Sequence, residues 1–317
     1  MILRRNLAVL TTVLVYVLIV LGGWIRANNA GLSCPDWPTC YGRWALTPSQ
    51  FEALGDVGYT YYEMMLEWTH RFIAGVIVGP AILLLAFLAW RWRVQDSAGF
   101  RLALGVLAVL LVQGSLGGVT VLDSNSPWSV ALHLGTALVL LSLMILMVQR
   151  YQGCRPVETG GGFHLLAVSL WLLAIGTMVT AAMTAKSGAS LACYEWPSCD
   201  GTFFPALDDP LLRIHYIHRT LAALTGIGLL VMLFWSRAGG WSGISSRALL
   251  ACLLVAVQIG LGAVVILREV PRWSQSAHQA TGVLLFVVLS GILWLVVRGR
   301  LQRDEGHAGL SGARSAV

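Results

Sequence analysis

The chain repeats a histidine–arginine pair, and the surrounding sequence repeats with it. His70-Arg71 and His218-Arg219 lie 148 positions apart, each near the start of a long apolar run. Other elements recur at similar offsets: Cys34 and Cys40 with Cys193 and Cys199, Trp37-Pro38 with Trp196-Pro197, Gln113 to Gly117 with Gln258 to Gly262, and His133 with His278. Repetition on this scale indicates two copies of one structural unit in tandem.

Eight apolar runs are long enough to cross a bilayer. Of the 317 residues, 57% are hydrophobic and only 11% are charged, and the apolar residues gather into stretches that match a hydrocarbon core of roughly 30 Å. The predicted spans are residues 8–27, 64–88, 101–122, 130–149, 164–185, 212–235, 248–268 and 276–297. Runs of this composition and length favour helices over the short alternating strands of a membrane barrel. We therefore expect an all-α membrane protein.

Four spans in each copy carry both halves through the membrane in the same direction. We expect two tandem four-helix bundles related by a pseudo-two-fold axis along the membrane normal. The N-terminal bundle covers residues 1–155 with an outer loop at 28–63, the C-terminal bundle covers 156–300 with an outer loop at 186–211, and 301–317 form a polar cytoplasmic tail.

The distribution of positive charge predicts the orientation. With the N-terminus inside, 13 of the 21 Lys and Arg residues fall on the cytoplasmic side: Arg4, Arg5, Arg91, Arg93, Arg101, Arg150, Arg155, Arg237, Arg247, Arg298, Arg300, Arg303 and Arg314. The positive-inside rule then places both termini in the cytoplasm, and the net charge of +6 needs no nucleic-acid partner. A cleaved signal peptide after Arg4-Arg5 is the alternative for the first run. With no transit-peptide-like extension before that run, we expect a multi-pass protein of a prokaryotic plasma membrane.

Histidines gather at the outer ends of the spans. The five are His70, His133, His215, His218 and His278, and the other two are His164, near the cytoplasmic side, and His307, in the tail. An ionisable residue in an apolar span needs a partner or a role. Two facing imidazoles suit the axial positions of a haem, whereas zinc or copper would want further ligands. We predict two haem sites, His70 with His133 and His218 with His278, with hydrogen-bonded core histidines as the structural alternative.

Residues beside these histidines fit a haem, although each has a structural explanation too. Arg71 and Arg219 could pair with haem propionates or could extend to the membrane interface as long basic side chains do. Glycines in the third and seventh spans would admit either a flat macrocycle or a neighbouring helix. They are Gly114, Gly117, Gly118, Gly260 and Gly262.

The two halves differ three residues before the repeated histidine. Glu67 precedes His70 on the same helical face, whereas His215 precedes His218. A carboxylate beside a porphyrin is a candidate general base or charge stabiliser; an ion pair with Arg71 or an interfacial position is the alternative. We predict that the N-terminal half performs chemistry and that the C-terminal half holds a resident haem.

The outer loops each hold one pair of cysteines, Cys34 with Cys40 and Cys193 with Cys199. Because thiols outside the cell meet an oxidising compartment, we expect two short disulfides that act as modest braces. A thiol–disulfide role in electron delivery, chiefly for Cys34 and Cys40, is the alternative. Cys154 and Cys252 are expected to be reduced.

Taken together, these residues resemble the haem A synthase family. The resemblance rests on Glu67-x-x-His70-Arg71, His133, His218-Arg219, His278 and the two cysteine pairs, and it runs from Gly22-Gly23 to the eighth span. It implies an oxidoreductase that hydroxylates the C8 methyl group of haem O twice, after which loss of water leaves the formyl group of haem A.

Carried onto this chain, the resemblance makes His70 and His133 the iron ligands of haem O and His218 and His278 those of a haem B cofactor. Glu67 becomes the catalytic carboxylate. The product would serve haem-copper terminal oxidases, and haem O synthase and a membrane electron acceptor are the implied partners beside the lipid bilayer. The sequence leaves the oligomeric state open, a homo-oligomer included.

Two other functions stay open. A bis-His diheme membrane cytochrome predicts two equally tight haems nearer opposite faces of the membrane, and a haem exporter or chaperone predicts exchangeable haem and no formyl product. All four predicted ligands lie at one depth in the sequence pattern, which disfavours electron transfer across the membrane.

Overall fold

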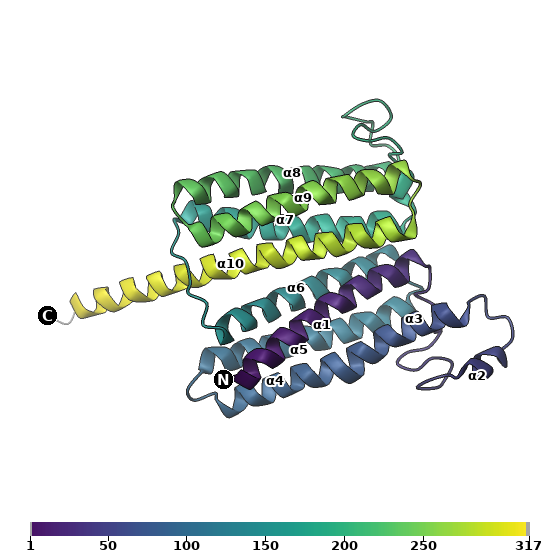
Figure 1. The fold of residues 1–317 in the computed structure, drawn as a ribbon, viewed down its shortest axis with the longest axis horizontal. Helices are drawn as coiled ribbons and strands as arrows, with labels where there is room; N and C mark the ends of the chain where they lie inside the picture. The colour runs from purple at the N-terminus through teal and green to yellow at the C-terminus, as the bar shows by residue number, and fades with distance from the viewer. Residues whose placement is uncertain (1, 315–317) are drawn as a thin grey trace.

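The computed structural model describes residues 2–314 of the chain, and the side chains of residues 2–304. Within this part, the helices long and apolar enough to span a membrane number eight (Figure 1). They are α1 (Ile2–Ala27), α3 to α4 (Tyr61–Arg91), α5 (Ser97–Leu122), α6 (Pro127–Tyr151), α7 (Gly161–Lys186), α8 (Pro210–Ala238), α9 (Ser242–Leu267) and α10 (Arg272–Arg314). The predicted all-α fold with eight spans is confirmed. The side chain of His307 lies outside the described residues.

Local signals explain where the histidine-bearing helices begin. Thr60 and Glu63 form a reciprocal capping box before α3. Ser126 caps α6 and is followed by a proline at the first helical position, and Asp209 does the same for α8. Because proline lacks the N–H that would be unpaired there, this arrangement fixes the first turn. The helices α3, α6 and α8, which carry predicted haem ligands, therefore each start at a defined residue, at the end of the molecule that bears the long loops.

The second span is not one uninterrupted α-helix. α3 (Tyr61–Phe72) passes through a π-helical segment, η1 (Ile73–Val78), into α4 (Gly79–Arg91). Gly79 donates its N–H to the carbonyl of Ala74, five residues earlier. Pro80 has no N–H and its ring crowds the carbonyl four residues before it, which favours this local widening. The widening begins at Ile73, two residues after Arg71.

The centre of the molecule lies along α1, α6 and α10. Half of the most apolar window of α6 and of α10 is buried, against 17–22% for the windows of α3 to α4, α5, α7, α8 and α9. The indole of Trp171 on α7 donates to the hydroxyls of Ser142 and Ser290 at 3.2 and 3.1 Å, and Trp294 donates to the carbonyl of Ser142 at 2.8 Å. These bonds join α6, α7 and α10 within the apolar interior.

α1 and α10 approach each other closely near their outer halves. A Cβ at Gly23 would lie 2.5 Å from the side chain of Gln279, and Gln279 donates to the carbonyl of Ile19 at 3.0 Å. Glycine at this position leaves room for the amide of Gln279 against α1, and a larger residue would make that side chain move. The contact places the first and last spans side by side.

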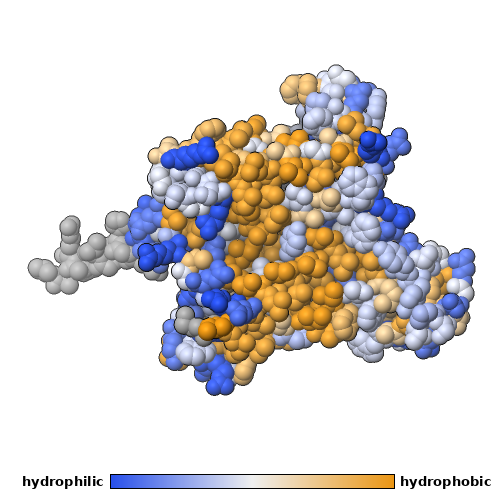
Figure 2. Space-filling view, in the orientation of Figure 1, coloured by the Kyte–Doolittle hydropathy of each residue, from blue (hydrophilic) through white to orange (hydrophobic). Residues whose placement is uncertain are grey.

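A broad apolar band surrounds the helices. Large side chains on the outward faces are exposed, among them Leu111 and Phe234 at 65% and 64%, and Figure 2 shows the band with hydrophilic residues at both ends. Such a continuous apolar surface fits contact with lipid. Both termini lie at one end, and the long loops with α2 (Pro48–Glu52) and η2 (Ala189–Leu191) lie at the other (Figure 1).

Candidate functional site

Each of the two long loops folds into the same short disulfide-closed turn. Cys34 pairs with Cys40 at an S–S distance of 1.99 Å, and Cys193 pairs with Cys199 at 2.04 Å. An isolated backbone bridge follows the second cysteine in both loops, to Arg43 in one and to Thr202 in the other. The proline after the tryptophan of each loop has a cis peptide bond. The repeat read from the sequence thus extends to local backbone structure.

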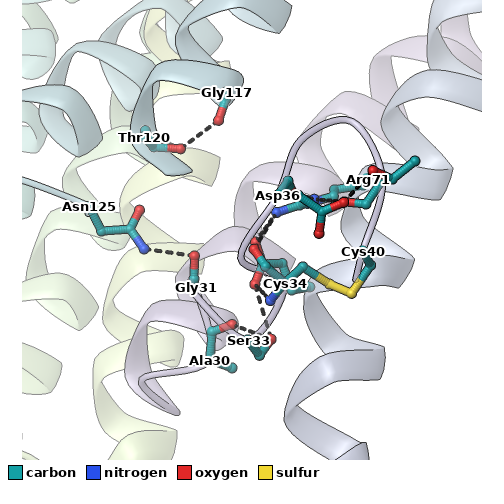
Figure 3. Close-up of polar contacts among 12 residues, drawn as sticks. Ala30, Gly31, Ser33, Cys34, Asp36, Cys40, Arg71, Gly117, Thr120 and Asn125 are labelled. Atoms are coloured by element: carbon teal, nitrogen blue, oxygen red, sulfur yellow. Dashed lines mark hydrogen bonds and ion pairs between the residues drawn. A yellow bond between two sulfur atoms is a disulfide. The ribbon is translucent and has the colours of Figure 1, made fainter. Parts of the chain in front are cut away.

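Arg71 ties the first of these turns to α3. Its terminal nitrogens donate to the carbonyls of Asp36 and Thr39, both at 2.5 Å, and of Cys34 at 3.1 Å (Figure 3). A guanidinium has five N–H donors in a rigid planar fork, which suits several carbonyls at once. The side chain therefore acts as a clamp between helix and loop.

Arg219 clamps the second turn to α8 through the equivalent carbonyls. It donates to Cys193 and Glu195 at 2.8 Å each and to Ser198 at 2.9 Å. These three acceptors stand 159 positions after those of Arg71, the same offset that relates the cysteine pairs. Sequence reasoning assigned both arginines to propionates or to the interface and missed the clamps, although the repeated His-Arg pairs and cysteines were a signal that could have found them.

Glu67 is buried between the first turn and α3. Its residue exposure is 5%. One carboxylate oxygen accepts from the hydroxyl of Ser33 at 3.0 Å and from the backbone N–H of Cys34 at 2.9 Å. The other accepts from Arg71 at 2.6 Å in an ion pair. The structure thus forms the Glu67–Arg71 pair that the sequence left as an alternative, and three donors fix the orientation of the carboxylate.

His215 occupies the equivalent place in the second half. Its Nδ1 lies 2.9 Å from the carbonyl of Ala189 and 3.4 Å from the backbone nitrogen of Cys193, and its Nε2 accepts from Arg219 at 3.1 Å. With the proton on Nδ1, a neutral imidazole satisfies both the carbonyl and the guanidinium. An uncharged side chain therefore completes the same anchor here.

His70 of α3 and His133 of α6 lie close enough to interact electrostatically. The amide nitrogen of Gln113, on α5, is 3.2 Å from Nδ1 of His133. A Cβ at Gly117 would be 3.3 Å from Cε1 of His133, and one at Gly22 would be 3.5 Å from Cε1 of His70. Within the described chain, Nδ1 of His70 is buried without a hydrogen-bond partner. Two imidazoles and the glycine faces beside them thus form one site.

The second pair, His218 of α8 and His278 of α10, interacts in the same way. Nδ1 of His218 lies 2.9 Å from the carbonyl of Thr177, which orients the ring and leaves Nε2 for another partner. A Cβ at Gly262 would be 3.1 Å from Cε1 of His278, as at Gly117. Among the described residues, Nδ1 of His278 has no hydrogen-bond partner.

All four histidines lie at a similar depth. His133 and His278 each stand six residues after the first residue of α6 and α10, His218 stands eight after the start of α8, and His70 nine after the start of α3. At 1.5 Å per residue these positions are about 9 to 14 Å from the helix starts. Both pairs therefore belong to the loop end of the molecule.

A group of cations between α1, α7 and α10 was not singled out from the sequence. Arg26 interacts electrostatically with both Lys186 and His278. Its guanidinium donates to the side-chain oxygen of Gln275 at 3.0 Å, and Arg272 donates to that of Asn28 at 3.3 Å. In the described part of the chain neither arginine contacts a carboxylate. Excess positive charge thus lies beside the second histidine pair.

Comparison with known proteins bears on the whole chain. Residues 5–290 match the model of the COX15-CtaA family, described as cytochrome oxidase assembly protein. A protein of Alkalihalophilus pseudofirmus named "Heme A synthase" is 26% identical over 301 residues, covering 92% of this chain and 96% of its own length. Proteins of the same name from Shewanella oneidensis and Methylobacterium sp. are both 29% identical; they cover 90% and 89% of this chain and 95% and 88% of their own lengths. The chain therefore belongs to the COX15-CtaA family of cytochrome oxidase assembly proteins, in agreement with its resemblance to haem A synthases.

Proposed function

We propose that this protein is a haem A synthase, which converts haem O to haem A for haem-copper terminal oxidases. The reaction consists of two hydroxylations of the C8 methyl group followed by loss of water to leave a formyl group. One observation carries the proposal: a buried carboxylate, Glu67, stands one helical turn from the His70 and His133 pair, whereas the His218 and His278 pair has His215 there. The family membership and the names of the relatives support it.

We assign haem O, the substrate, to His70 and His133. The close glycine faces at Gly22 and Gly117 suit a flat macrocycle between the helices. Glu67 would then deprotonate water or stabilise positive charge at the oxidised methyl group. Since three donors hold its carboxylate, the side chain would reach the reacting group in one orientation. Hydroxylation removes electrons, so an acceptor in the membrane completes the reaction.

We assign haem B, the cofactor, to His218 and His278. The donor set fits, because the bond between His218 Nδ1 and the carbonyl of Thr177 leaves Nε2 as the available ligand atom, the usual arrangement for a metal-bound imidazole. Gly262 also fits, since it lets the imidazole of His278 lie against α9, where a methyl group would press on the ring. When bound, haem B supplies one-electron redox chemistry.

The cationic group at Arg26, Lys186 and Arg272 is a stronger candidate for haem propionates than Arg71 and Arg219. The terminal nitrogens of the latter two are engaged with loop carbonyls. Arg26 and Arg272 instead contact neutral amide oxygens, which a carboxylate would replace with a stronger charge-assisted bond. We expect these cations to orient the haem at the second pair.

We further propose that both termini are cytoplasmic and that the disulfide loops face outward. The positive-inside pattern supports this orientation, as does the position of both cysteine pairs at the end opposite the termini (Figure 1). Residues 1–155 and 156–300 would then form the two pseudo-symmetric bundles. The Cys34–Cys40 bridge adjoins Glu67 through the N–H of Cys34, so its reduction would disturb the carboxylate whether or not it carries electrons itself.

The test is to express the chain in a bacterial host that makes haem O but has no haem A synthase, and to extract the haems and determine their masses. We expect haem B and haem A with the unaltered chain, and haem B with unconverted or half-oxidised haem O with Glu67→Ala. His215→Gln is the matched control and should still yield haem A. Two tightly held haems with no formyl product would instead indicate a diheme cytochrome, and exchangeable haem without that product would indicate a carrier.

A further inference from the structure

A polar cavity lies at the end of the bundle where α1 begins, far from the histidine pairs. It has a volume of about 250 Å³ and is lined by Arg4, Asp96, Arg150, Tyr151 and Arg298. These residues come from α1, the connection before α5, the end of α6, and α10. The cavity is therefore built where the first helix, the sixth and the last meet.

The described lining carries three guanidinium groups and a single carboxylate. The carboxylate of Asp96 forms an ion pair with Arg150 and accepts a hydrogen bond from its Nε. Burial tends to raise the pKa of Asp96, but hydrogen bonds from Arg150 and the N–H of Gly99 outweigh it and hold that pKa below its ordinary value. The carboxyl is thus ionised at neutral pH, and two positive charges remain in excess.

Two arginines are held at the cavity without an anionic partner among the described residues. Arg4 packs over the rings of Trp92 and Tyr151, with centroid distances of 4.8 and 5.4 Å. Arg298 lies near enough to Arg150 for their like charges to interact. Cation–π contacts steady a guanidinium but leave its charge uncompensated, and two like charges nearby are unfavourable unless an anion joins them.

The lining of the cavity also contains hydrogen-bond donors that lack an acceptor among the described residues. In the described chain, Nη1 of Arg298 and the hydroxyl of Tyr151 are both buried without a partner. A buried donor left unsatisfied costs about 1–3 kcal/mol, and more when it is charged. Excess positive charge and unused donors in one cavity define a ligand that is anionic and rich in acceptor oxygens.

We propose that this cavity binds a phosphate group, supplied by the headgroup of an anionic phospholipid. Phosphate offers several acceptor oxygens and negative charge, which guanidinium forks recognise well. The lipid is the favoured source because Arg298 ends an apolar run on α10 and comes two residues after the buried Val296. Figure 2 shows hydrophilic residues bordering the apolar band at this end, the level at which headgroups lie.

The test uses the full-length protein, purified in detergent and stripped of lipid, with binding followed by native mass spectrometry. The probes are phosphatidylglycerol, phosphatidylcholine and inorganic phosphate. We expect phosphatidylglycerol to bind about tenfold more tightly than phosphatidylcholine, and Arg298→Gln to weaken it by about tenfold, since one charged hydrogen bond to a phosphate is worth about that factor. Inorganic phosphate should compete weakly with phosphatidylglycerol.

Arg237→Gln is the matched control. Arg237 is exposed in the last turn of α8, at the same end of the molecule as the cavity, and it does not line the cavity. It should leave phosphatidylglycerol binding unchanged. If Arg298→Gln does not accumulate, Arg4→Gln on α1 carries the same expectation. An equal effect of the Arg298 and Arg237 variants would overturn the site, and binding of inorganic phosphate without preference between the two lipids would overturn the lipid assignment.

Discussion

Replacing Glu67 by histidine would separate the structural role of this residue from its chemistry. The second half already uses His215 in this place, where it accepts from Arg219 at 3.1 Å. Glu67→His should therefore give Arg71 a neutral nitrogen acceptor and keep the loop anchored. The variant removes the carboxylate while preserving the contact that the fold requires.

The expected cost follows from the contacts that each substitution removes. Glu67→Ala deprives Arg71 of its buried anionic partner and leaves the N–H of Cys34 without an acceptor, a loss of about 3–5 kcal/mol for a broken buried pair. Glu67→His restores an acceptor for Arg71, so we expect a loss of about 1–2 kcal/mol, near the worth of one charged hydrogen bond. The alanine variant should thus be clearly the less stable of the two.

The assay combines thermal unfolding in detergent with mass analysis of extracted haems. If Glu67 is the acid–base group, Glu67→His should retain haem but lower the rate of haem A formation by about 10²- to 10⁴-fold. His215→Gln, which changes the equivalent anchor of the other half, should keep the rate near that of the unaltered protein. Haem A formation at an undiminished rate by Glu67→His would refute a catalytic role and leave Glu67 as an anchor only.

Three further outcomes are expected. Gly262→Ala should reduce the binding of the proposed haem B, measured by absorbance per protein, because its methyl group would lie 3.1 Å from Cε1 of His278, the proposed ligand; Gly260→Ala, with open space around it, should not. Hydrogen bonds from the first disulfide turn outweigh burial and lower the pKa of Asp36. The ionised side chain therefore stabilises the turn above its unfolded pKa of about 3.9, and this stabilisation is lost as pH falls through the lower folded pKa. Proteolysis of residues 28–60 should rise with acid, and Asp36→Asn should already be susceptible at neutral pH. Replacing Cys34 and Cys40 by serine should lower stability by about 2 kcal/mol for a bridge of sequence separation 6, measured by thermal unfolding.

Much of the fold could be predicted from the sequence because long apolar runs and repeated motifs can be recognised without knowledge of the packing. The eight spans follow from run length alone, and the 159-residue offset of the cysteines anticipates two turns of matching backbone. The widening of the second span at η1 could not be predicted in this way. It depends on how the carbonyl of Ala74 and the ring of Pro80 are accommodated together, which is a matter of packing.

The sequence names the residues of the candidate site but not their contacts. The repeat draws attention to Arg71 and Arg219, yet it does not say whether a guanidinium meets a propionate, the membrane interface or three backbone carbonyls. That choice depends on the path of a loop that lies 32 to 37 residues from Arg71 and 21 to 26 residues from Arg219 along the chain. The charge of Arg26 beside His278 escapes sequence reasoning for the same reason, since α1 and α10 meet only in three dimensions.

The contacts of Arg71 and Arg219 indicate which side chain the fold requires at position 67. Both turns are held by an arginine on the same three carbonyls, and both arginines also contact the side chain four residues earlier. In the second half that side chain is a neutral imidazole, and the turn has the same disulfide, backbone bridge and arginine contacts as in the first. A carboxylate is thus unnecessary for holding the loop. We propose that its presence beside only one histidine pair reflects a need there for a negative charge or a proton acceptor. The difference between the halves, rather than their likeness, therefore supports placing the proposed chemistry at His70 and His133.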